Sequence, residues 1–336
     1  MGGRTRVQLG RREDLGADCA NCFGLCCVAL AFSRSVDFPV DKPAGEPCTN
    51  LDPHDACRIH PELRDRGWKG CTVFDCSGAG QKVSRHTFAG RSWRDDAETQ
   101  RAMFATFPVV RRLHELLRYL DEAITLVEPH ADASEWRDAF EHVRALSDGT
   151  QESLVALDVD AEYGAARDLL LRASEIARGG AGADGGEGAA GRGAQGRGGR
   201  GGRGGRGAAG GAAEGRAGRG PQVGTGSNGA GGKGGRGGRG GVGRTVPGAG
   251  SDLLGADLSG ADLRGVTLRG SVAIAADLSG ADLRRCDLLG VDLRDADLRG
   301  ADLGEAIYLT QMQVNAARGD VATVLPSGFE RPSHWA

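Results

Sequence analysis

Long apolar runs, aromatic side chains and export signals are scarce or missing in this sequence. No stretch approaches the roughly 18 apolar residues of a membrane span, and residues 1–15 (MGGRTRVQLGRREDL) lack the apolar core of a secretory signal. Aromatic residues make up only 5% of the 336 residues. These absences predict a soluble, cytoplasmic protein with no membrane partner, whose globular part is much shorter than its chain.

Motifs for common enzyme chemistry are also missing. The sequence holds no Ser–His–Asp arrangement, no paired-carboxylate motif and no dinucleotide fingerprint. Residues 78–93 (GAGQKVSRHTFAGRSW) are glycine-rich but lack the Gly-Lys-Ser/Thr ending of a phosphate-binding loop, so Lys82 and Ser84 are not spaced to hold a nucleotide. We interpret this segment as a loop closing over the cysteine-rich region. No catalytic or cofactor-binding residue is predicted, and the sequence leans away from an enzyme.

Glycine is abundant instead, and it gathers in residues 178–250. That segment carries 12 Lys and Arg against 3 Asp and Glu, while the rest of the chain carries 30 against 42. A chain so rich in glycine has little apolar surface to offset its ordering entropy, so we predict a disordered linker. Its Arg-Gly-Gly repeats resemble the RGG boxes of RNA-binding proteins, which leaves a weak RNA contact open beside a plain basic tether.

Residues 96–177 have a helical pattern. Apolar side chains recur at steps of three and four, the spacing of one helix face: Met103, Phe107, Val110, Leu113, Leu117, Leu120, Ile124 and Val127. Pro108 is expected to start or kink this helix. A second helix is predicted from Ser134 as its N-cap, and a third carries Leu169 and Leu170. We expect a small helical bundle packed on the cysteine-rich region.

From residue 251 to 310 the chain repeats every five residues. Leucine holds the centre of ten of the twelve units, Ala273 and Tyr308 being the exceptions, and the residue two positions earlier is always small. This pattern resembles the pentapeptide-repeat family, A(D/N)LxX. The resemblance implies a right-handed, four-sided β-helix of about twenty residues per coil with the leucine and the small residue inside. Cys286 holds a small inward position and is expected to be buried packing.

Residues 311–336 are expected to close this solenoid. The apolar side chains expected to plug its last coil are Ile307, Tyr308, Met312, Val314, Leu325, Phe329 and Trp335. The repeated aspartates are expected to cap the backbone at each corner. Some pentapeptide-repeat proteins mimic DNA and bind topoisomerases, but residues 251–310 carry 11 acidic residues against 6 arginines, which is too mixed for a good imitation of a duplex. An unknown protein docking on the β-helix is the favoured partner, and DNA mimicry remains an alternative.

Residues 15–95 hold eight of the nine cysteines: Cys19, Cys22, Cys26, Cys27, Cys48, Cys57, Cys71 and Cys76. In a reducing compartment clustered cysteines are more often metal or redox sites than disulfides. Two residues between Cys19 and Cys22 let a tight turn aim both sulfurs at one ion. Disulfides, and redox nucleophiles without a metal, are the alternatives. His60 is a candidate substitute ligand, and His54 is expected in a turn.

At residues 17–80 the sequence resembles the zinc- or iron-chelating CxxCxxCC family. The matching features are Cys19 and Cys22, the Cys26–Cys27 doublet, the later C-x-x-L and C-x-I-H segments, and the last cysteine pair; three residues rather than two separate Cys22 from the doublet. The resemblance implies metal binding by these eight thiols, with no reaction attached. They could hold two Cys₄ zincs, or one iron–sulfur cluster and a zinc. Adjacent Cys26 and Cys27 would more naturally serve two centres.

The sequence thus predicts a multidomain protein. Its parts are a cysteine-rich metal-chelating module (15–95), an α-helical region (96–177), a disordered RGG-like linker (178–250), a pentapeptide-repeat β-helix (251–310) and a C-terminal cap (311–336). The predicted role is a metal-binding scaffold or adaptor protein, with zinc as the favoured cofactor. An iron–sulfur protein of oxidoreductase type is the alternative.

Overall fold

A computed structural model describes residues 14–179 and 246–335. Both ranges belong to one compact unit. The predicted linker, apart from its two ends, lies outside the described residues. Within the described part of the chain, no helix combines the length and apolar character that crossing a membrane requires.

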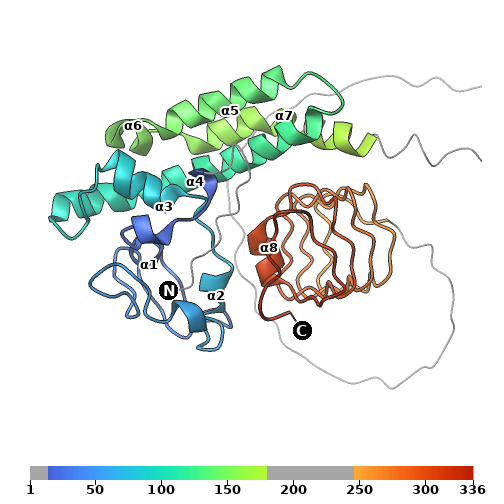
Figure 1. The fold of residues 1–336 in the computed structure, drawn as a ribbon, viewed down its shortest axis with the longest axis horizontal. Coiled ribbons are helices and arrows are strands. Elements are labelled where there is room, and N and C mark those ends of the chain that lie inside the picture. Colours follow the sequence, from blue (N-terminus) through green and yellow to red (C-terminus); the bar gives the residue numbers. More distant parts are fainter. Residues whose placement is uncertain (1–13, 180–245, 336) are drawn as a thin grey trace, which may run out of the picture. The chain divides into compact units, whose positions relative to one another are not determined.

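The amino-terminal range is helical, as the sequence predicts (Figure 1). Short helices and loops hold the cysteines, and longer helices follow. The helices of the described residues are η2 (Cys19–Asn21), α1 (Leu25–Val28), η3 (His60–Glu62), α2 (Lys69–Thr72), α3 (Ala79–Gln81), the π-helix η4 (Lys82–Thr87), α4 (Ala97–Val127), α5 (Ser134–Ser147), α6 (Gln151–Val155), α7 (Val159–Gly179) and α8 (Gln311–Ala316).

Helix α4 is the centre of the bundle, and α5, α6 and α7 pack against it. Its apolar stripe is buried along the whole helix, as predicted. Asp96 caps its amino end by accepting hydrogen bonds from the backbone N–H groups of Glu98 and Thr99 at 2.9 and 2.8 Å. Pro108 lies inside α4 and does not start it. The apolar stripe continues on both sides of the proline, which helps to keep one helix where local propensity alone favours an end.

Two other local expectations need correction. Helix α5 has Ala133 as its N-cap, and Ser134 is its first residue, because the Asp132 carboxylate accepts the Ser134 backbone N–H at 3.1 Å. The segment 78–93, expected as a loop, contains α3 and η4. The Ser84 hydroxyl there accepts the Phe23 backbone N–H at 3.1 Å, so this helical turn closes over the cysteine-rich loops.

The repeat region winds into stacked coils (Figure 1). Parallel bridges join residues 20 positions apart, for example Asp252 to Val272 and Val272 to Asp292, and four such positions occur in each coil. Within the described residues the pairing consists of these single-residue bridges and forms no extended strand. The observed 20-residue coil agrees with the predicted repeat, whereas its right hand stays a prediction.

The five-residue unit explains this coil. Nine of the ten central leucines are buried, with Leu268, Leu298 and Leu303 at 1% exposure or less, and Leu258 is partly buried. Each repeat aspartate accepts the backbone N–H two residues later, as Asp262 does from Arg264 at 3.2 Å, so the predicted corner cap is confirmed. The corner residue has a positive φ in ten of the twelve units. Glycine meets this need in most units, but Ala275 takes it with φ 55°.

The end of the repeat is closed by its own tail. Thr310 forms a capping box with Gln313 at the start of α8, and the chain then returns to the coil by bridges from Arg318 and Val324. Val314 and Trp335 are buried in the solenoid core, with Leu325 and Phe329 packed against it. These four predicted plug residues are confirmed.

Ile307 and Tyr308 behave differently. Both belong to the core of the helical region rather than to the interior of the coil. Tyr308 has φ 57°, its hydroxyl donates to the Leu170 carbonyl at 3.1 Å, and its backbone N–H donates to Glu122 Oε1 at 2.5 Å. The prediction that they plug the last coil is therefore wrong. The break of the repeat at Tyr308 turns this side chain outward onto α4 and α7.

A buried carboxylate joins the repeat to the same helices. Asp287 is 1% exposed, and its Oδ2 accepts the Ser174 hydroxyl at 2.6 Å. The Arg269 guanidinium donates to the same oxygen at 2.7 Å and also reaches the Leu170 carbonyl at 3.2 Å. Because buried charges need partners, this network favours one packed arrangement of the repeat against α7.

Candidate metal centre and its surroundings

Each of the nine cysteines is a free thiol, and all of them lie in the described ranges. The eight predicted ligands occupy short helices and loops: η2 carries Cys19 and α1 carries the Cys26–Cys27 doublet, while α2 carries Cys71. Cys286, by contrast, is fully buried in the repeat core, as predicted. The disulfide alternative thus has no counterpart in this structure.

Cys27 packs against the large core of the helical region and also against a second, small core. Four of the sulfurs belong to this small core, and we call them the Cys48 group: Cys27, Cys48, Cys57 and Cys71. This core contains the buried side chains of Ile59, Leu63 and Trp68. The Cys48 backbone N–H donates to the Cys27 carbonyl at 2.9 Å, and an antiparallel bridge pairs Leu51 with Cys57. Residues spread over 45 positions of sequence are therefore held together by backbone pairing and a shared apolar core.

Cys22 and Cys76 meet elsewhere, beside Gly80 of α3. A Cβ atom at Gly80 would lie 2.7 Å from the Cys22 sulfur and 3.6 Å from the Cys76 sulfur, so glycine leaves room for both. Cys19 and Cys26 act electrostatically on Cys22. The sulfurs of Cys26 and Cys27 are 3.9 Å apart, closer than the divergence expected for neighbours in sequence. Cys26 thus lies between the two groups.

Backbone N–H groups point at several of the sulfurs. Those of Leu25 and Gly24 hydrogen-bond to Cys22, and those of Gly80 and Gly78 hydrogen-bond to Cys76. The Asn50 backbone N–H lies 3.5 Å from the Cys48 sulfur. Such donors two to four residues after the cysteine favour the anionic thiolate over the thiol. Tight turns after the cysteines therefore favour the anionic form of these sulfurs.

Burial disfavours the charged thiolate form of these cysteines. It raises the pKa of Cys22 to about 11 and the pKa values of Cys71 and Cys76 to about 12. The hydrogen bond with Cys27, together with burial, raises the pKa of Cys26 as well. As free thiols these groups stay protonated near neutral pH, which disfavours the alternative of redox nucleophiles without a metal. A bound cation would reverse this preference, because it stabilises the thiolates directly.

The eight thiols are of the ligand type that soft metals prefer, although the structure does not bring their sulfurs together around one point. Across residues 14–179 and 246–335, no three His, Cys, Asp or Glu side chains are placed to hold a metal ion together. Thiolate sulfur is nevertheless the ligand of structural zinc and of iron–sulfur clusters. His60 begins η3 and is exposed. His54 lies in the expected turn, where Asp52 Oδ1 accepts its backbone N–H at 2.7 Å.

Lys42 is a buried cation that the sequence did not reveal. Its ammonium group donates to the carbonyls of Val28, Pro43 and Glu46 at 3.1, 3.0 and 2.8 Å, and the residue is 6% exposed. Burial lowers its pKa, while Cys48, Cys27 and Cys26 act in the opposite direction. No carboxylate in the described ranges forms an ion pair with this lysine. The only sequence signal was a lysine within a loop between two cysteine pairs.

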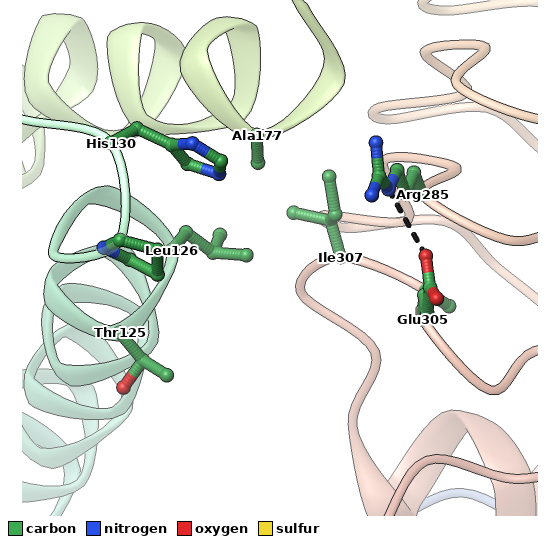
Figure 2. Close-up of a pocket in the computed structure, with 9 residues that line it drawn as sticks. Thr125, Leu126, His130, Ala177, Arg285, Glu305 and Ile307 are labelled. Carbon is green, nitrogen blue, oxygen red and sulfur yellow. Dashed lines mark hydrogen bonds and ion pairs between the residues drawn. The ribbon is translucent and has the colours of Figure 1, made fainter. Parts of the chain in front are cut away.

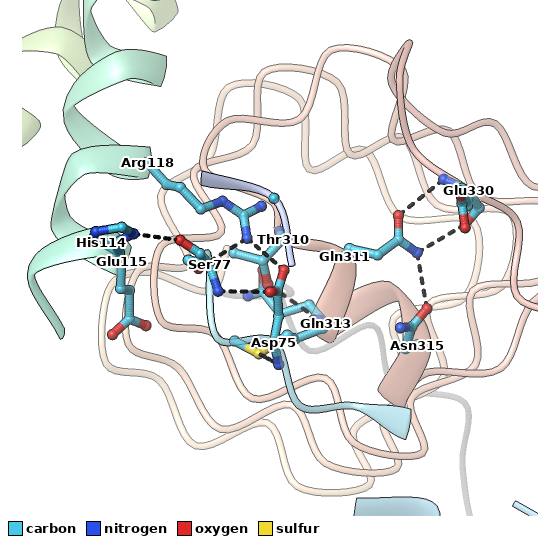
Figure 3. A network of polar contacts seen from close by, with 12 residues as sticks. Asp75, Ser77, His114, Glu115, Arg118, Thr310, Gln311, Gln313, Asn315 and Glu330 are labelled. Carbon is cyan, nitrogen blue, oxygen red and sulfur yellow. Dashed lines mark hydrogen bonds and ion pairs between the residues drawn. The ribbon is translucent and has the colours of Figure 1, made fainter. Parts of the chain in front are cut away.

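A second missed set of residues holds the Cys76 loop (Figure 3). Asp75 Oδ1 accepts the Ser77 backbone N–H at 2.7 Å, and its Oδ2 accepts from Arg118 at 3.0 Å. Nδ1 of His114, which is 4% exposed, lies 2.8 Å from the Ser77 carbonyl. Ser77 has φ 49°, a conformation that a non-glycine residue holds only with support. Helix α4 thus fixes the loop that positions Cys76.

A cavity of about 280 Å³ lies between helices α4 and α7 and the repeat (Figure 2). Leu126 and Ile307 contribute apolar surface, and His130 contributes a ring. Its Arg285 and Glu305 form an ion pair with each other at 3.0 Å. These two charges therefore compensate each other within the cavity.

Several of the exposed charges of the coil are also paired. Asp282 forms ion pairs with Arg264 and Arg284 at 2.6 Å, and Arg284 lies 3.5 Å from Asp302. The arginine hydrogen bonds keep the pKa of Asp282 well below its ordinary range.

Comparison with known families matches eight copies described as pentapeptide repeats to residues 249–270 and 274–307. This region consists of pentapeptide repeats. The gap in the match includes Ala273, one of the two units that lack the central leucine.

One relative from Bacillus subtilis (strain 168), described as the uncharacterized protein YybG, is 45% identical over 165 residues. That match covers 49% of this chain and 59% of the relative, so less than two thirds of the relative's length is matched. No solved structure matches the chain. The resemblance of residues 17–80 to the CxxCxxCC family stays a prediction.

Proposed function

We propose that this protein binds metal through its amino-terminal cysteines and uses its pentapeptide repeats as an interaction scaffold. The observation that carries the first part is the gathering of free thiols, four in the Cys48 group and two beside Gly80, with backbone N–H groups directed at the sulfurs of Cys22 and Cys76. Uncharged buried thiols have no need of such donors, whereas metal-bound thiolates do.

The metal's role in this proposal is structural. Zinc or an iron–sulfur cluster would supply the positive charge that lets the thiolates of these short helices stay buried together. The chain's own residues shape the loops: Gly80 leaves space for two sulfurs, and Asp75, His114 and Arg118 hold the segment of Cys76. We favour zinc, with an iron–sulfur protein of oxidoreductase type as the alternative.

The scaffold role rests on the exposed faces of the repeat. Pentapeptide repeats often mediate protein interactions, and one face here displays apolar side chains: Leu254 and Val272 are 64% and 41% exposed. The aspartates of the coil accept corner hydrogen bonds, and several of them, such as Asp282, also pair with arginine. This pairing disfavours DNA mimicry, because a mimic needs unpaired acidic charge in long rows. RNA contact through the Arg/Gly segment lies outside the described residues.

Elemental analysis of anaerobically purified protein tests the metal proposal. We expect zinc bound to a colourless protein. Iron with a visible absorption band that bleaches on reduction would instead support the iron–sulfur alternative. Zinc and iron both at background, with all eight thiols freely titratable, would refute the proposal.

A further inference from the structure

Helix α8 is bound to the repeat by side chains in its middle (Figure 3). The Gln313 side-chain amide donates to the carbonyls of Leu288 and Val291 at 2.8 and 2.9 Å. The next residue, Val314, is fully buried in the repeat core. These contacts fix the position of α8 on the repeat that it closes.

Two other side chains of α8 hold a segment of the cysteine-rich region, residues 72–75. The Asn315 side-chain amide donates to the Thr72 carbonyl at 3.0 Å. The Met312 sulfur accepts the Asp75 backbone N–H at 3.1 Å. Because Met312 and Asn315 are three positions apart, they share one face of the helix. One short helix therefore contacts both the repeat and this segment.

Residues 72–75 lie directly between Cys71 and Cys76. The two thiols pack against different apolar cores, Cys71 against the small core and Cys76 against the large one. Helix α4 holds the same segment through Arg118, whose guanidinium donates to Asp75 Oδ2 at 3.0 Å. The backbone beside each of these two cysteines is thus fixed by contacts from α8, and α4 adds a further one.

Two long side chains extend the contact around α8. Lys69 of α2 forms an ion pair with Asp295 of the repeat at 2.7 Å, and the lysine side chain is 15% exposed. Salt screens such a partly buried pair less than an exposed one. The Arg64 guanidinium donates to the Asn315 carbonyl at 3.0 Å. The cysteine-rich region is therefore joined to the repeat on both sides of residues 72–75.

We propose that α8 couples the cysteine-rich region to the repeat, so that a ligand that fixes Cys71 and Cys76 also tightens the closure of the repeat. A ligand that orders residues 72–75 strengthens their hydrogen bonds to α8, and an ordered α8 lowers the entropy cost of ordering the two thiols. Where the ligand is a metal, the inference rests on the proposed metal binding. The coupling requires no particular number of metal centres, because these contacts act on the backbone and not on the sulfurs.

Substitutions in α8 test the coupling from either end. Gln313→Ala removes the hydrogen bonds to the repeat and leaves residues 72–75 untouched, whereas Asn315→Ala removes the hydrogen bond to Thr72. Ser279→Ala is the matched control, because it removes a hydrogen bond to Asp277 at a corner of the repeat. All the variants are made in the full chain and studied without metal under reducing conditions.

Brief alkylation followed by peptide mass spectrometry reads the result. We expect both α8 variants to react about two- to tenfold faster at Cys71 and Cys76, the effect of losing about one net hydrogen bond. Cys57 is held by its bridge with Leu51 and should react as in the wild type, as should every cysteine of the control. Unchanged rates at Cys71 and Cys76, or equal acceleration in the control, would overturn the coupling.

Hydrogen exchange supplies a readout that needs no substitution, should a variant fail to fold. Zinc added to the metal-free wild type should slow amide exchange in residues 311–316, and Asn315→Ala should lose most of this slowing. Zinc binding without a change in these residues would overturn the coupling and leave metal binding intact. No zinc binding at all would refute the proposed function instead, and the alkylation rates would then decide the coupling alone.

Discussion

Gly80→Ala tests the packing of Cys22 and Cys76 beside α3. Gly80 lies in α3 without a positive φ, so alanine fits its backbone conformation. An alanine there should stabilise the helix by about 0.5–1 kcal/mol relative to glycine. The new Cβ, however, would lie 2.7 Å from the Cys22 sulfur and 3.3 Å from the Cys22 Cβ. Overpacking of this kind costs about 1–3 kcal/mol.

We therefore expect a net loss of up to about 2 kcal/mol in the free energy of unfolding, since the clash outweighs the helix propensity. Urea unfolding followed by circular dichroism measures it. Gly164→Ala is the matched control, because Gly164 lies in α7 and a Cβ there meets nothing within 4 Å. That control should gain about 0.5–1 kcal/mol.

Cysteine reactivity gives the same substitution a functional readout. Displacement of Cys22 by the new methyl group should speed alkylation of Cys22 and Cys76 and leave Cys57 and Cys71 unchanged. The reasoning would be refuted if Gly80→Ala raised the unfolding free energy as much as Gly164→Ala, with no change in the reactivity of Cys22.

Three further substitutions probe the corner, the buried cation and the helix cap. Ala275→Gly should stabilise the protein by about 0.5–1 kcal/mol in urea unfolding, because Ala275 has φ 55° at a corner where other units use glycine; a lower midpoint would contradict this. Lys42→Met should speed chelator-induced alkylation of the Cys48 group by about tenfold, which corresponds to about 1.4 kcal/mol, and leave Cys22 and Cys76 unchanged; equal acceleration at Cys22 and Cys76 would count against a local counter-charge. For Asp96, hydrogen bonds from the Thr99 backbone and hydroxyl lower the pKa from 3.8 to about 2. A lowered folded-state pKa stabilises above the ordinary pKa, and this contribution is lost as the pH falls from about 4 to about 2. Asp96→Asn should therefore unfold at lower urea than the wild type at pH 7, and the difference should vanish near pH 2; a constant difference would exclude the linkage.

The repeat could be predicted in detail because its information is local. Each unit supplies its own buried leucine, its own aspartate cap and its own corner residue, as Leu263 and Asp262 illustrate. The stripe of α4 is similarly local, since its period alone decides which face is buried. Predicting these parts of the fold required no knowledge of contacts between residues distant in sequence.

The outward turn of Ile307 and Tyr308 could not be predicted from the repeat. Their direction depends on the Leu170 carbonyl and on Glu122, which are more than a hundred residues away in sequence. The position of Pro108 within its helix also could not be predicted from local sequence. Its local preference for a helix start is overridden by the packing of α4.

The cysteine region was predictable in its residues and not in its grouping. The count and spacing of the thiols predict a metal site, and this stays a prediction. Which apolar core each thiol contacts depends on the tertiary packing: Cys22 packs against the large core, whereas Cys27 packs against both cores. The supporting side chains of His114 and Arg118 come from a helix some forty residues away, where no motif marks them.

Protection of the eight amino-terminal thiols before and after chelation tests the central claim most directly. Protein purified without air would be alkylated under native conditions, treated with a strong chelator, and alkylated again with a heavier reagent. We predict that Cys19 through Cys76 resist the first reagent and take up the second as metal is released. Thiols that react at once, or that resist both reagents while no metal is released, would contradict the account.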